Sequence, residues 1–452
     1  MKLERPPFRL KDLHSDLDRV TRGFHLFGKV PQITNGKYLP WHEIRHRARQ
    51  VGADPIDAWC AIKLQRYAAK RDLELVQPDG QPFSLNLEGE LQEPLHRIDR
   101  ATGGGGPAAL NSDRGVLTDE YHRARMRIRS LMHEAAESSI MEGAATTRKI
   151  AVDMLRSDRK PATHGERMIA NNYAAMQRIK HWLDRPLSVQ MLLELQATLT
   201  NGTLEPKDQD AGGRLRRLDE PIRVEGFATG EVIHVPPSAE LLPHRLAALC
   251  EFANAAHEGR RFLHPIVKAS ILHFMIGYEH PFVDGNGRTA RAVFYWYALR
   301  NGYDVFEYMP ISDRIRLGTS RYPQAYIDTE LDDGDLTYFV LYKLDIIEQA
   351  LEGFAERLRH EEAKIKRSEQ LLRLSNSLNL RQRLLIEHAL RHPQTLYTVS
   401  SHENSNGIVK ATARADLEGL AKKRLLVTAM RGRERVYQLA PGVPARLARK
   451  GL

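Results

Sequence analysis

A short stretch in the second half of the chain combines residue types that together suit phosphate chemistry. Two glycines, Gly285 and Gly287, permit positive φ angles, and Asn286 between them tolerates such angles better than most residues. Successive backbone N–H groups of such a loop can point the same way and form an anion-binding nest. The stretch is His280-Pro281-Phe282-Val283-Asp284-Gly285-Asn286-Gly287-Arg288-Thr289-Ala290-Arg291. We interpret it as a phosphate-binding loop.

Charged side chains around the glycines extend this interpretation. Arg288 and Arg291 are three residues apart and share one face of a helix, where two guanidiniums suit a polyphosphate. Asp284 is the only carboxylate of the stretch, and a carboxylate among phosphate donors is suited to hold Mg²⁺. His280 begins the loop, where its imidazole can serve as a base.

Two helices are expected to position these side chains. Residues 266–278 and residues 288–299 carry apolar residues at helical spacing on either side of the loop. Pro281 lacks an N–H and disfavours the α region at His280, so the first helix should end there. The second helix should begin near Arg288, and its free N–H groups would add positive potential. The alternative is a plain helix–turn–helix connection, which would not need a base, a carboxylate and two arginines together.

The stretch resembles the HPFx[DE]GNGRxxR signature of Fic-domain proteins and matches it at every fixed position. The resemblance implies transfer of AMP from ATP onto a hydroxyl side chain of a target protein, or of the chain itself, with release of pyrophosphate. It implies that His280 is the general base. It implies that Asp284 binds the metal ion, Mg²⁺ or Mn²⁺, that bridges the α- and β-phosphates. The nucleotide-binding residues that it implies are Gly285, Asn286, Gly287, Arg288 and, at the γ-phosphate, Arg291.

An earlier helix, expected over residues 119–141, ends in Ser138-Ser139-Ile140-Met141-Glu142-Gly143. Gly143 is a natural helix stop, and taken alone the segment is a helix end with a solvated glutamate. Beside the loop, Ser138, Glu142 and Gly143 resemble the inhibitory [ST]xxxE[GN] motif of the Fic family. The resemblance implies that Glu142 pairs with Arg291 in place of the γ-phosphate, so that the chain inhibits itself.

Other functions stay open beside protein adenylyltransferase activity. A transcription regulator would use the same core only to sense nucleotide, although the intact His280 and Asp284 disfavour this. A hydrolase would remove AMP from modified proteins, with Glu142 positioning the attacking water. Gly287, where phosphate-transferring relatives carry lysine, favours AMP transfer over phosphate transfer. UMP transfer is not excluded, because base selection lies outside the loop.

The segment between the two motifs predicts a β-hairpin. Residues 222–226 and 232–237 suit two strands, with Thr229-Gly230 between them. Gly213-Arg214-Leu215-Arg216 resembles the stretch that precedes the flap of Fic proteins. The resemblance implies that the hairpin is this flap, which clamps a target segment by strand addition, whereas a plain surface hairpin is the alternative. The flap residues that we predict are Val232, Ile233, His234 and Val235.

Composition bounds the remaining possibilities. A chain of 452 residues allows two to four domains, and the net charge of +10 allows an acidic partner. The two cysteines, Cys60 and Cys250, lie far apart without a motif and suit buried thiols in a reducing compartment. No apolar run reaches membrane length, and the N-terminus lacks the apolar segment of a signal peptide. We expect a soluble, cytoplasmic protein.

The expected fold is mainly α, with a Fic helical core that carries the β-hairpin flap. Four parts follow one another: a helical N-terminal module with a glycine-rich linker (1–115), the core with the inhibitory helix (116–345), a connecting helix that Gly353 divides (346–375), and a C-terminal winged helix-turn-helix (376–445). In the first part, helices are expected up to Gln50 and from Pro55 to Arg71. His42-Glu43-Ile44-Arg45-His46 matches a zinc-protease pattern, but its arginine neighbours predict a solvated helix face.

The last part resembles a winged helix. Residues 381–391 would form its first helix, residues 409–423 its recognition helix, and residues 425–439 a two-stranded wing. The basic residues that would meet DNA phosphates are Arg414, Lys422, Lys423, Arg431 and Arg433. Many winged helices bind proteins or form dimers instead, so the sequence leaves open both DNA and a homodimer as partners.

Overall fold

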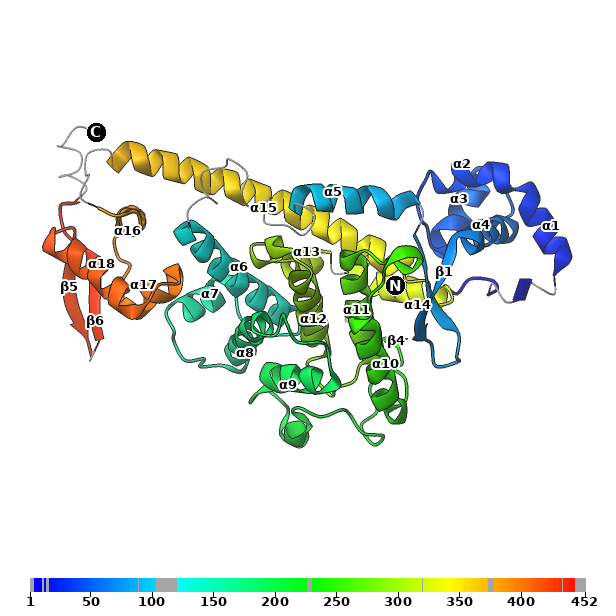
Figure 1. Ribbon diagram of the computed structural model, residues 1–452, viewed down its shortest axis with the longest axis horizontal. Helices are drawn as coiled ribbons and strands as arrows, with labels where there is room; N and C mark the ends of the chain where they lie inside the picture. Colours follow the sequence, from blue (N-terminus) through cyan, green and yellow to red (C-terminus); the bar gives the residue numbers. More distant parts are fainter. Residues whose placement is uncertain are drawn as a thin grey trace. The chain divides into compact units, whose positions relative to one another are not determined.

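The computed structural model describes residues 4–9, 12–13, 16–87, 89–102, 120–225, 230–318, 320–372, 378–432 and 434–443. Its elements confirm the mainly α fold with a small β-hairpin in the core (Figure 1). The predicted glycine-rich linker, Thr229 of the flap turn and Arg433 of the wing turn lie outside the described residues. Within the described residues, none of the helices combines the length and the apolar composition that crossing a membrane requires.

The N-terminal elements are α1 (Leu17–His25), α2 (Val30–Thr34), α3 (Trp41–Gln50), α4 (Pro55–Ala69), β1 (Lys70–Val76), β2 (Pro82–Asn86) and α5 (Gln92–Thr102). The middle of the chain forms α6 (Glu120–Met141), α7 (Arg148–Arg156), α8 (His164–Lys180), α9 (Val189–Thr200), β3 (Val224–Glu225), β4 (Val232–His234), α10 (Leu242–Asn254), α11 (Pro265–Glu279) and α12 (Asn286–Arg300). The C-terminal elements are α13 (Ser312–Leu317), α14 (Arg321–Leu331), α15 (Thr337–Leu372), α16 (Leu380–Arg391), α17 (Val399–Asn406), α18 (Lys410–Lys422), β5 (Leu426–Arg431) and β6 (Glu434–Leu439).

The chain divides into two compact units. The first comprises residues 1–106, 174–306 and 311–349, and the second comprises residues 107–173, 307–310 and 350–452. One boundary between the units falls within α8, and another falls within α15. The long helix α15 continues through Gly353, so the predicted break there is wrong. The four predicted domain boundaries stay a prediction.

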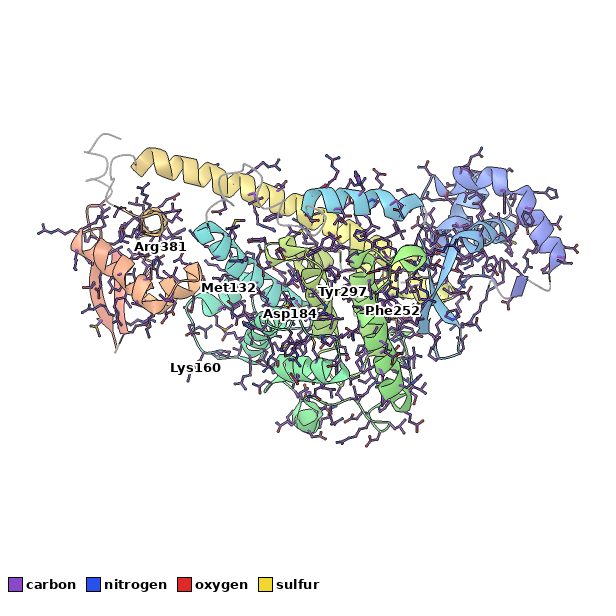
Figure 2. All side chains as sticks on the ribbon, in the orientation of Figure 1. Met132, Lys160, Asp184, Phe252, Tyr297 and Arg381 are labelled. Atoms are coloured by element: carbon purple, nitrogen blue, oxygen red, sulfur yellow. The ribbon has the colours of Figure 1, made fainter. Side chains whose placement is uncertain are left out.

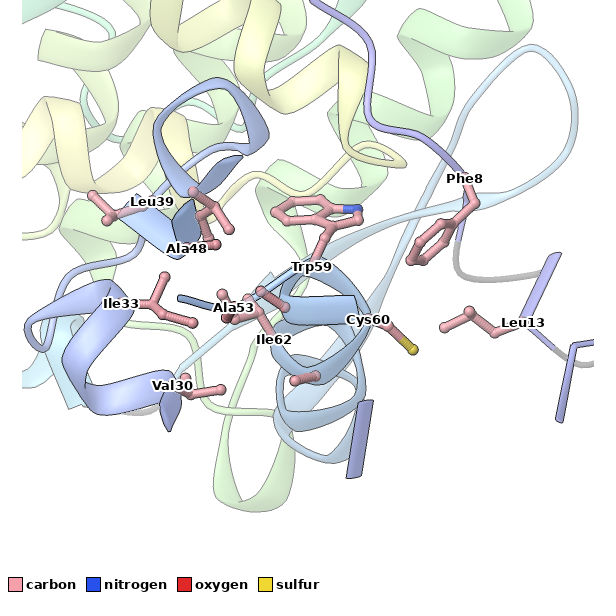
Figure 3. Packing of buried hydrophobic residues seen from close by; sticks show 13 residues of the cluster. Phe8, Leu13, Val30, Ile33, Leu39, Ala48, Ala53, Trp59, Cys60 and Ile62 are labelled. Carbon is pink, nitrogen blue, oxygen red and sulfur yellow. The ribbon is translucent and has the colours of Figure 1, made fainter. Parts of the chain in front are cut away.

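In the first unit, the N-terminal module has its own apolar core. Trp59, Cys60 and Ile62 of α4 belong to one buried apolar cluster with Ile33 and Ala48 (Figure 3). Asp54 caps α4, because its carboxylate accepts the N–H groups of residues 56 and 57. The second cysteine, Cys250 of α10, is buried as well. Burial raises the pKa of both thiols to about 11, so they are unreactive at neutral pH.

The β-hairpin of this module was not predicted. The expected helix from Pro55 ends at Ala69, and Arg71 belongs to β1, which pairs antiparallel with β2. Strand β2 also meets the turn after α14, because Ser84 forms a parallel bridge with Asp335. The strand therefore depends on a partner some 250 residues away, which local sequence does not reveal.

Buried charges join the N-terminal module to the turn after α14. The ammonium of Lys63 lies 2.5 Å from Asp332 Oδ1, and the hydroxyl of Tyr338 donates to Asp332 Oδ2 at 2.8 Å. Arg66 donates to the Tyr338 hydroxyl at 2.6 Å and to the carbonyl of Leu39 at 2.8 Å. Each charge has a partner, as buried charges require.

The helices α11 and α12 lie side by side at the centre of the same unit (Figure 1). Lys268 of α11 is fully enclosed, and its ammonium lies 5.2 Å from the ring centre of Phe252 and 5.4 Å from that of Tyr297 (both labelled in Figure 2). It also donates to the carbonyl of Ala255 at 2.8 Å. Both helices are therefore anchored on several sides.

In the second unit, α6 packs on α7 and α17. Asn172 of α8 donates to the carbonyl of Ala135 and to Ser139 Oγ, which fixes the last turns of α6. The C-terminal elements follow the predicted order, with a first helix, a later helix and a two-stranded hairpin. Helix α17 between them was not predicted. The winged-helix assignment stays a prediction.

Candidate active site

The first helix of the site ends at His280, as the sequence predicted. His280 adopts a left-handed conformation (φ 44°, ψ 58°), and its N–H still donates to the carbonyl of Ile276. A left-handed residue ends a helix, and the ring of Pro281 makes the α conformation unfavourable there. The Nδ1 atom of His280 lies 3.2 Å from the carbonyl oxygen of Gly277. A proton on Nδ1 suits this contact, and in that tautomer Nε2 carries the lone pair that a general base uses.

The loop after His280 is closed by the side chain of Asn286. Its Oδ1 atom accepts the N–H of Phe282 at 3.0 Å, and its Nδ2 atom donates to the carbonyl of Phe282 at 2.7 Å. Phe282 itself is fully buried. The amide of Asn286 therefore holds the loop, and only its backbone is left to face a phosphate.

The second helix begins at Asn286, two residues earlier than the sequence predicted. Its N-cap is Gly285, with φ 88°, where a Cβ atom would also lie 3.0 Å from Thr200. The first bond of the helix runs from the Thr289 N–H to the Gly285 carbonyl. The N–H groups of Asn286, Gly287 and Arg288 therefore precede the hydrogen-bonded ladder, where a helix N-terminus attracts anions.

The two arginines of the loop are enclosed. Arg288 is fully buried, donates to the carbonyl of Leu199 at 2.9 Å and contacts Asp284 Oδ2 at 2.9 Å. Arg291 is 1% exposed on the same helix. Burial, together with the charges of Lys343 and Arg291, holds the pKa of neighbouring His273 well below its ordinary value. Arg291, together with Lys343, therefore contributes positive potential inside this part of the unit.

The carboxylate of Asp284 is accessible to a metal ion. Its side chain is 43% exposed, although Oδ1 accepts the N–H of Gly285 at 2.6 Å and Oδ2 contacts Arg288. Among the described residues, no three His, Cys, Asp or Glu side chains gather as a metal site. A lone accessible carboxylate fits Mg²⁺, which is commonly held by one or two carboxylates and the phosphates of a substrate.

Several residues that support the loop were missed from the sequence. Gln196 of α9 donates to the carbonyl of Asp284 at 3.1 Å and accepts the N–H of Gly213 at 2.6 Å. Arg245 of α10 forms two 2.7 Å bonds to the carboxylate of Glu279, next to His280. Burial raises the pKa of Glu279, and Arg245 opposes that shift. A glutamine within the apolar run of residues 187–199 was the one available signal.

The predicted hairpin lies next to this site in the same unit. Strand β4 pairs antiparallel with β3, with Val224 opposite His234. His234 contacts Glu330 Oε2 through Nδ1 at 2.8 Å and the carbonyl of Tyr278 through Nε2 at 2.7 Å. Val235 is 67% exposed, whereas His234 is buried. The hairpin is thus fastened to the end of α11 and keeps an exposed residue just beyond β4.

The predicted inhibitory residues belong to the second unit. Ser138 is buried in the last turn of α6. Glu142 follows the helix and is exposed, and Gly143 has φ 89°. Gly143 therefore ends the helix as expected for a left-handed glycine. The pairing of Glu142 with Arg291 would join the two units and stays a prediction.

A family model and several known proteins have sequences similar to this chain. The sequence model of the Fic/DOC family matches residues 186–298. A relative named protein adenylyltransferase Fic from Drosophila willistoni is 28% identical over 257 residues, which is 54% of this chain and 46% of that protein. Another with the same name, from Nematostella vectensis, is 28% identical over 121 residues, 27% of this chain and 26% of that protein. The chain spans about half the length, or less, of these curated relatives.

A solved structure is also similar to this chain. The crystal structure of a Fic family protein from Desulfovibrio desulfuricans G20 covers 78% of this chain and 95% of that chain, with 20% identity and a TM-score of 0.46. The sequence match spans the helices and the loop that build the site described above, from α9 to α12. Residues 186–298 therefore form a Fic domain.

Proposed function

We propose that the protein transfers AMP from ATP to a hydroxyl side chain of a target protein or of itself. One observation carries the proposal: a histidine with Nδ1 on a carbonyl precedes the N–H groups that begin α12. A base beside an anion-binding helix N-terminus suits attack of a hydroxyl on a phosphate. The matching relatives named protein adenylyltransferase Fic support the same reaction.

In this reaction, the hydroxyl oxygen attacks the α-phosphorus of ATP. His280 Nε2 takes the hydroxyl proton, the new O–P bond forms, and the bond to the bridging oxygen breaks so that pyrophosphate leaves. The N–H groups of Asn286, Gly287 and Arg288 and the guanidinium of Arg291 hold the phosphates. Mg²⁺ held by Asp284 would neutralise charge on the phosphates. The chain thus contributes positioning and electrostatic stabilisation.

Self-inhibition is part of the proposal. Glu142, placed by the left-handed Gly143 at the end of α6, would pair with Arg291 and exclude the productive pose of the γ-phosphate. A carboxylate competes with a phosphate for the same guanidinium because both accept a bidentate pair. Removal of Glu142 would then release the activity.

The C-terminal elements add a proposal about partners. Arg414 and Lys422 of α18 and Arg431 of β5, which are among the residues predicted to contact DNA, are exposed, and exposed cations suit DNA phosphates. Fluorescence anisotropy with duplex DNA at increasing salt tests this, because phosphate contacts weaken steeply with salt. Salt-independent binding, or none, would favour a protein partner or a homodimer instead.

The central experiment uses Glu142→Gly protein, cell lysate and ATP labelled on the α-phosphate. We expect covalent label on a protein and release of pyrophosphate. ATP labelled on the γ-phosphate is the matched control, because AMP transfer leaves no γ-label. Label from the γ-phosphate would show phosphate transfer. Loss of AMP from a modified protein that is incubated with the parent protein, which keeps Glu142, would show a hydrolase. Labelled UTP in parallel reveals the base preference.

A further inference from the structure

The end of helix α11 carries backbone carbonyls that the helix itself cannot satisfy. The last four carbonyl groups of any helix lack an intrahelical partner. Here the Gly277 carbonyl meets His280 Nδ1, and the Tyr278 carbonyl meets His234 Nε2. The next three carbonyls, those of Glu279, His280 and Pro281, share one partner residue.

That partner is Arg216, from the stretch before the flap. Its Nε atom donates to the His280 carbonyl at 2.9 Å, and its Nη2 atom lies 3.4 Å from the Glu279 carbonyl. Its backbone N–H donates to the Pro281 carbonyl at 2.9 Å. Arg216 is 7% exposed, so these bonds form away from bulk water. One residue therefore satisfies the backbone on both sides of the base.

Arg216 also reaches the flap. Its Nη2 atom donates to the carbonyl of Pro237, three residues after β4 ends. A planar guanidinium can donate hydrogen bonds to carbonyls in several directions at once, whereas the donors of an ammonium all lie on one nitrogen atom. The Arg216 side chain therefore bonds both the end of the flap and the backbone of His280.

We propose that Arg216 is a positioning residue, which fixes the backbone of His280 and the end of the flap relative to each other. The proposal rests on the proposed function, in which the flap holds the target segment and His280 takes the proton of its hydroxyl. A shared support for both would keep the hydroxyl within reach of Nε2. Arg216 touches neither substrate nor reacting atoms in this scheme.

Arg214 provides a matched control. It lies two residues away and forms ion pairs with Glu220 at 2.6 Å and Asp210 at 3.1 Å, but none of its partners belongs to the loop or the flap. Replacing Arg214 therefore disturbs the same segment without removing a bond to His280. If disturbance of the segment alone matters, both substitutions should act alike.

The kinetic test compares Arg216→Met, Arg216→Lys and Arg214→Met in full-length Glu142→Gly protein. For Arg216→Met we expect kcat for self-modification to fall about a hundredfold, as misplacement of a base by about 1 Å does. The KM for ATP should stay unchanged, because the phosphate-binding groups remain. Arg216→Lys, which keeps one donor group, should be intermediate, and Arg214→Met should match its parent. An equal loss in Arg214→Met, or none in Arg216→Met, would overturn the proposal.

A second measurement does not depend on activity. The ¹⁵N signals of the His280 ring, assigned by their loss in His280→Ala, report which nitrogen carries the proton. We expect one tautomer, protonated on Nδ1, in the parent and in Arg214→Met, and a mixture in Arg216→Met. Unchanged tautomers in Arg216→Met would overturn the proposal. A changed tautomer in a protein that transfers no AMP would keep the positioning role and reject the proposed function.

Discussion

Arg288 and Asp284 pair with each other across 2.9 Å in the loop, one fully buried and the other 43% exposed. The proposed reaction gives each of them a further partner: a phosphate at the backbone N–H of the arginine and a metal ion at the carboxylate. Binding of Mg·ATP would therefore place a cation at Asp284 and a phosphate at the start of α12, beside the ion pair. The pair keeps both side chains in place before the nucleotide arrives.

Asp284→Ala should abolish both transfer and its dependence on Mg²⁺. The substitution removes the carboxylate that is suited to the metal, so phosphate charge stays uncompensated during attack. Initial rates across a Mg²⁺ titration check this, with the exposed Asp219→Ala as the control. A variant that responds to Mg²⁺ as its parent does would place the metal on another residue.

His280→Ala should lower transfer by about two to four orders of magnitude, as loss of a general base does. ATP binding should be retained, because the imidazole acts on the hydroxyl and not on the phosphates. Transfer from labelled ATP and calorimetric binding of ATP measure the two effects separately. His244→Ala, an exposed histidine of α10, should change neither. Transfer at the parental rate would remove His280 from the mechanism.

Glu142→Gly should raise the transfer rate roughly ten- to a hundredfold, which corresponds to about 1.5–3 kcal/mol for a charge-assisted hydrogen bond. Arg291→Ala should stay inactive, since it also removes the group that holds the γ-phosphate. The double variant should resemble Arg291→Ala. Self-modification at saturating ATP measures all three. Equal rates for Glu142→Gly and the parent would make residues 138–143 an ordinary helix end.

Asp332→Asn should destabilise the first unit by about 3–5 kcal/mol. The substitution removes the anion at 2.5 Å from the buried ammonium of Lys63, which keeps only the longer pair with Asp333 at 3.5 Å, and removal of one partner of a buried ion pair costs that much. Urea unfolding followed by tryptophan fluorescence checks this. Glu43→Gln, which breaks the exposed pair with Arg47, should cost less than about 1 kcal/mol. Similar losses of unfolding free energy in both variants would mean that the buried ion pair contributes no more to stability than the exposed one.

Low pH should lower the stability of the second unit, because unfolding exposes His133 of α6 to protonation. Burial, and then the charges of Arg129, Arg148 and Arg357, lower the pKa of His133 to about 4. The unfolded chain, with a pKa near 6.5, binds the proton first, so stability falls as pH drops from about 6.5 to 4, by at most about 3 kcal/mol. Hydrogen exchange of α6 amides across this range measures the effect. His133→Gln should reduce the dependence of stability on pH, and an unchanged dependence would contradict the role given to His133.

The loop was predictable because its information is local. Glycines, a proline and charged residues within one short stretch determine the left-handed His280 and the helix start near Asn286. The apolar spacing of α11 and α12 is equally local. The ends of both helices fall within two residues of the positions expected from the sequence.

The supports of the loop could not be predicted in the same way. Gln196 and Arg216 bond the loop, and Arg245 bonds Glu279 just before it, across separations of between 34 and 88 residues along the chain. Strand β2 likewise needs Asp335 as its neighbour. The bonds that these residues form become apparent only after folding brings donor and acceptor together. The glutamine in the apolar run and the resemblance of residues 213–216 mark two of the positions but not their partners.

The two enclosed thiols make the protein a convenient host for spectroscopic labels. Cys60 and Cys250 are buried, and their raised pKa values of about 11 keep them protonated at neutral pH. A maleimide dye added to the folded chain should therefore react with an introduced cysteine before either native one. A cysteine at exposed Val235 or at Glu142 would report movement of the flap or of the helix end, with no need to remove a native thiol first.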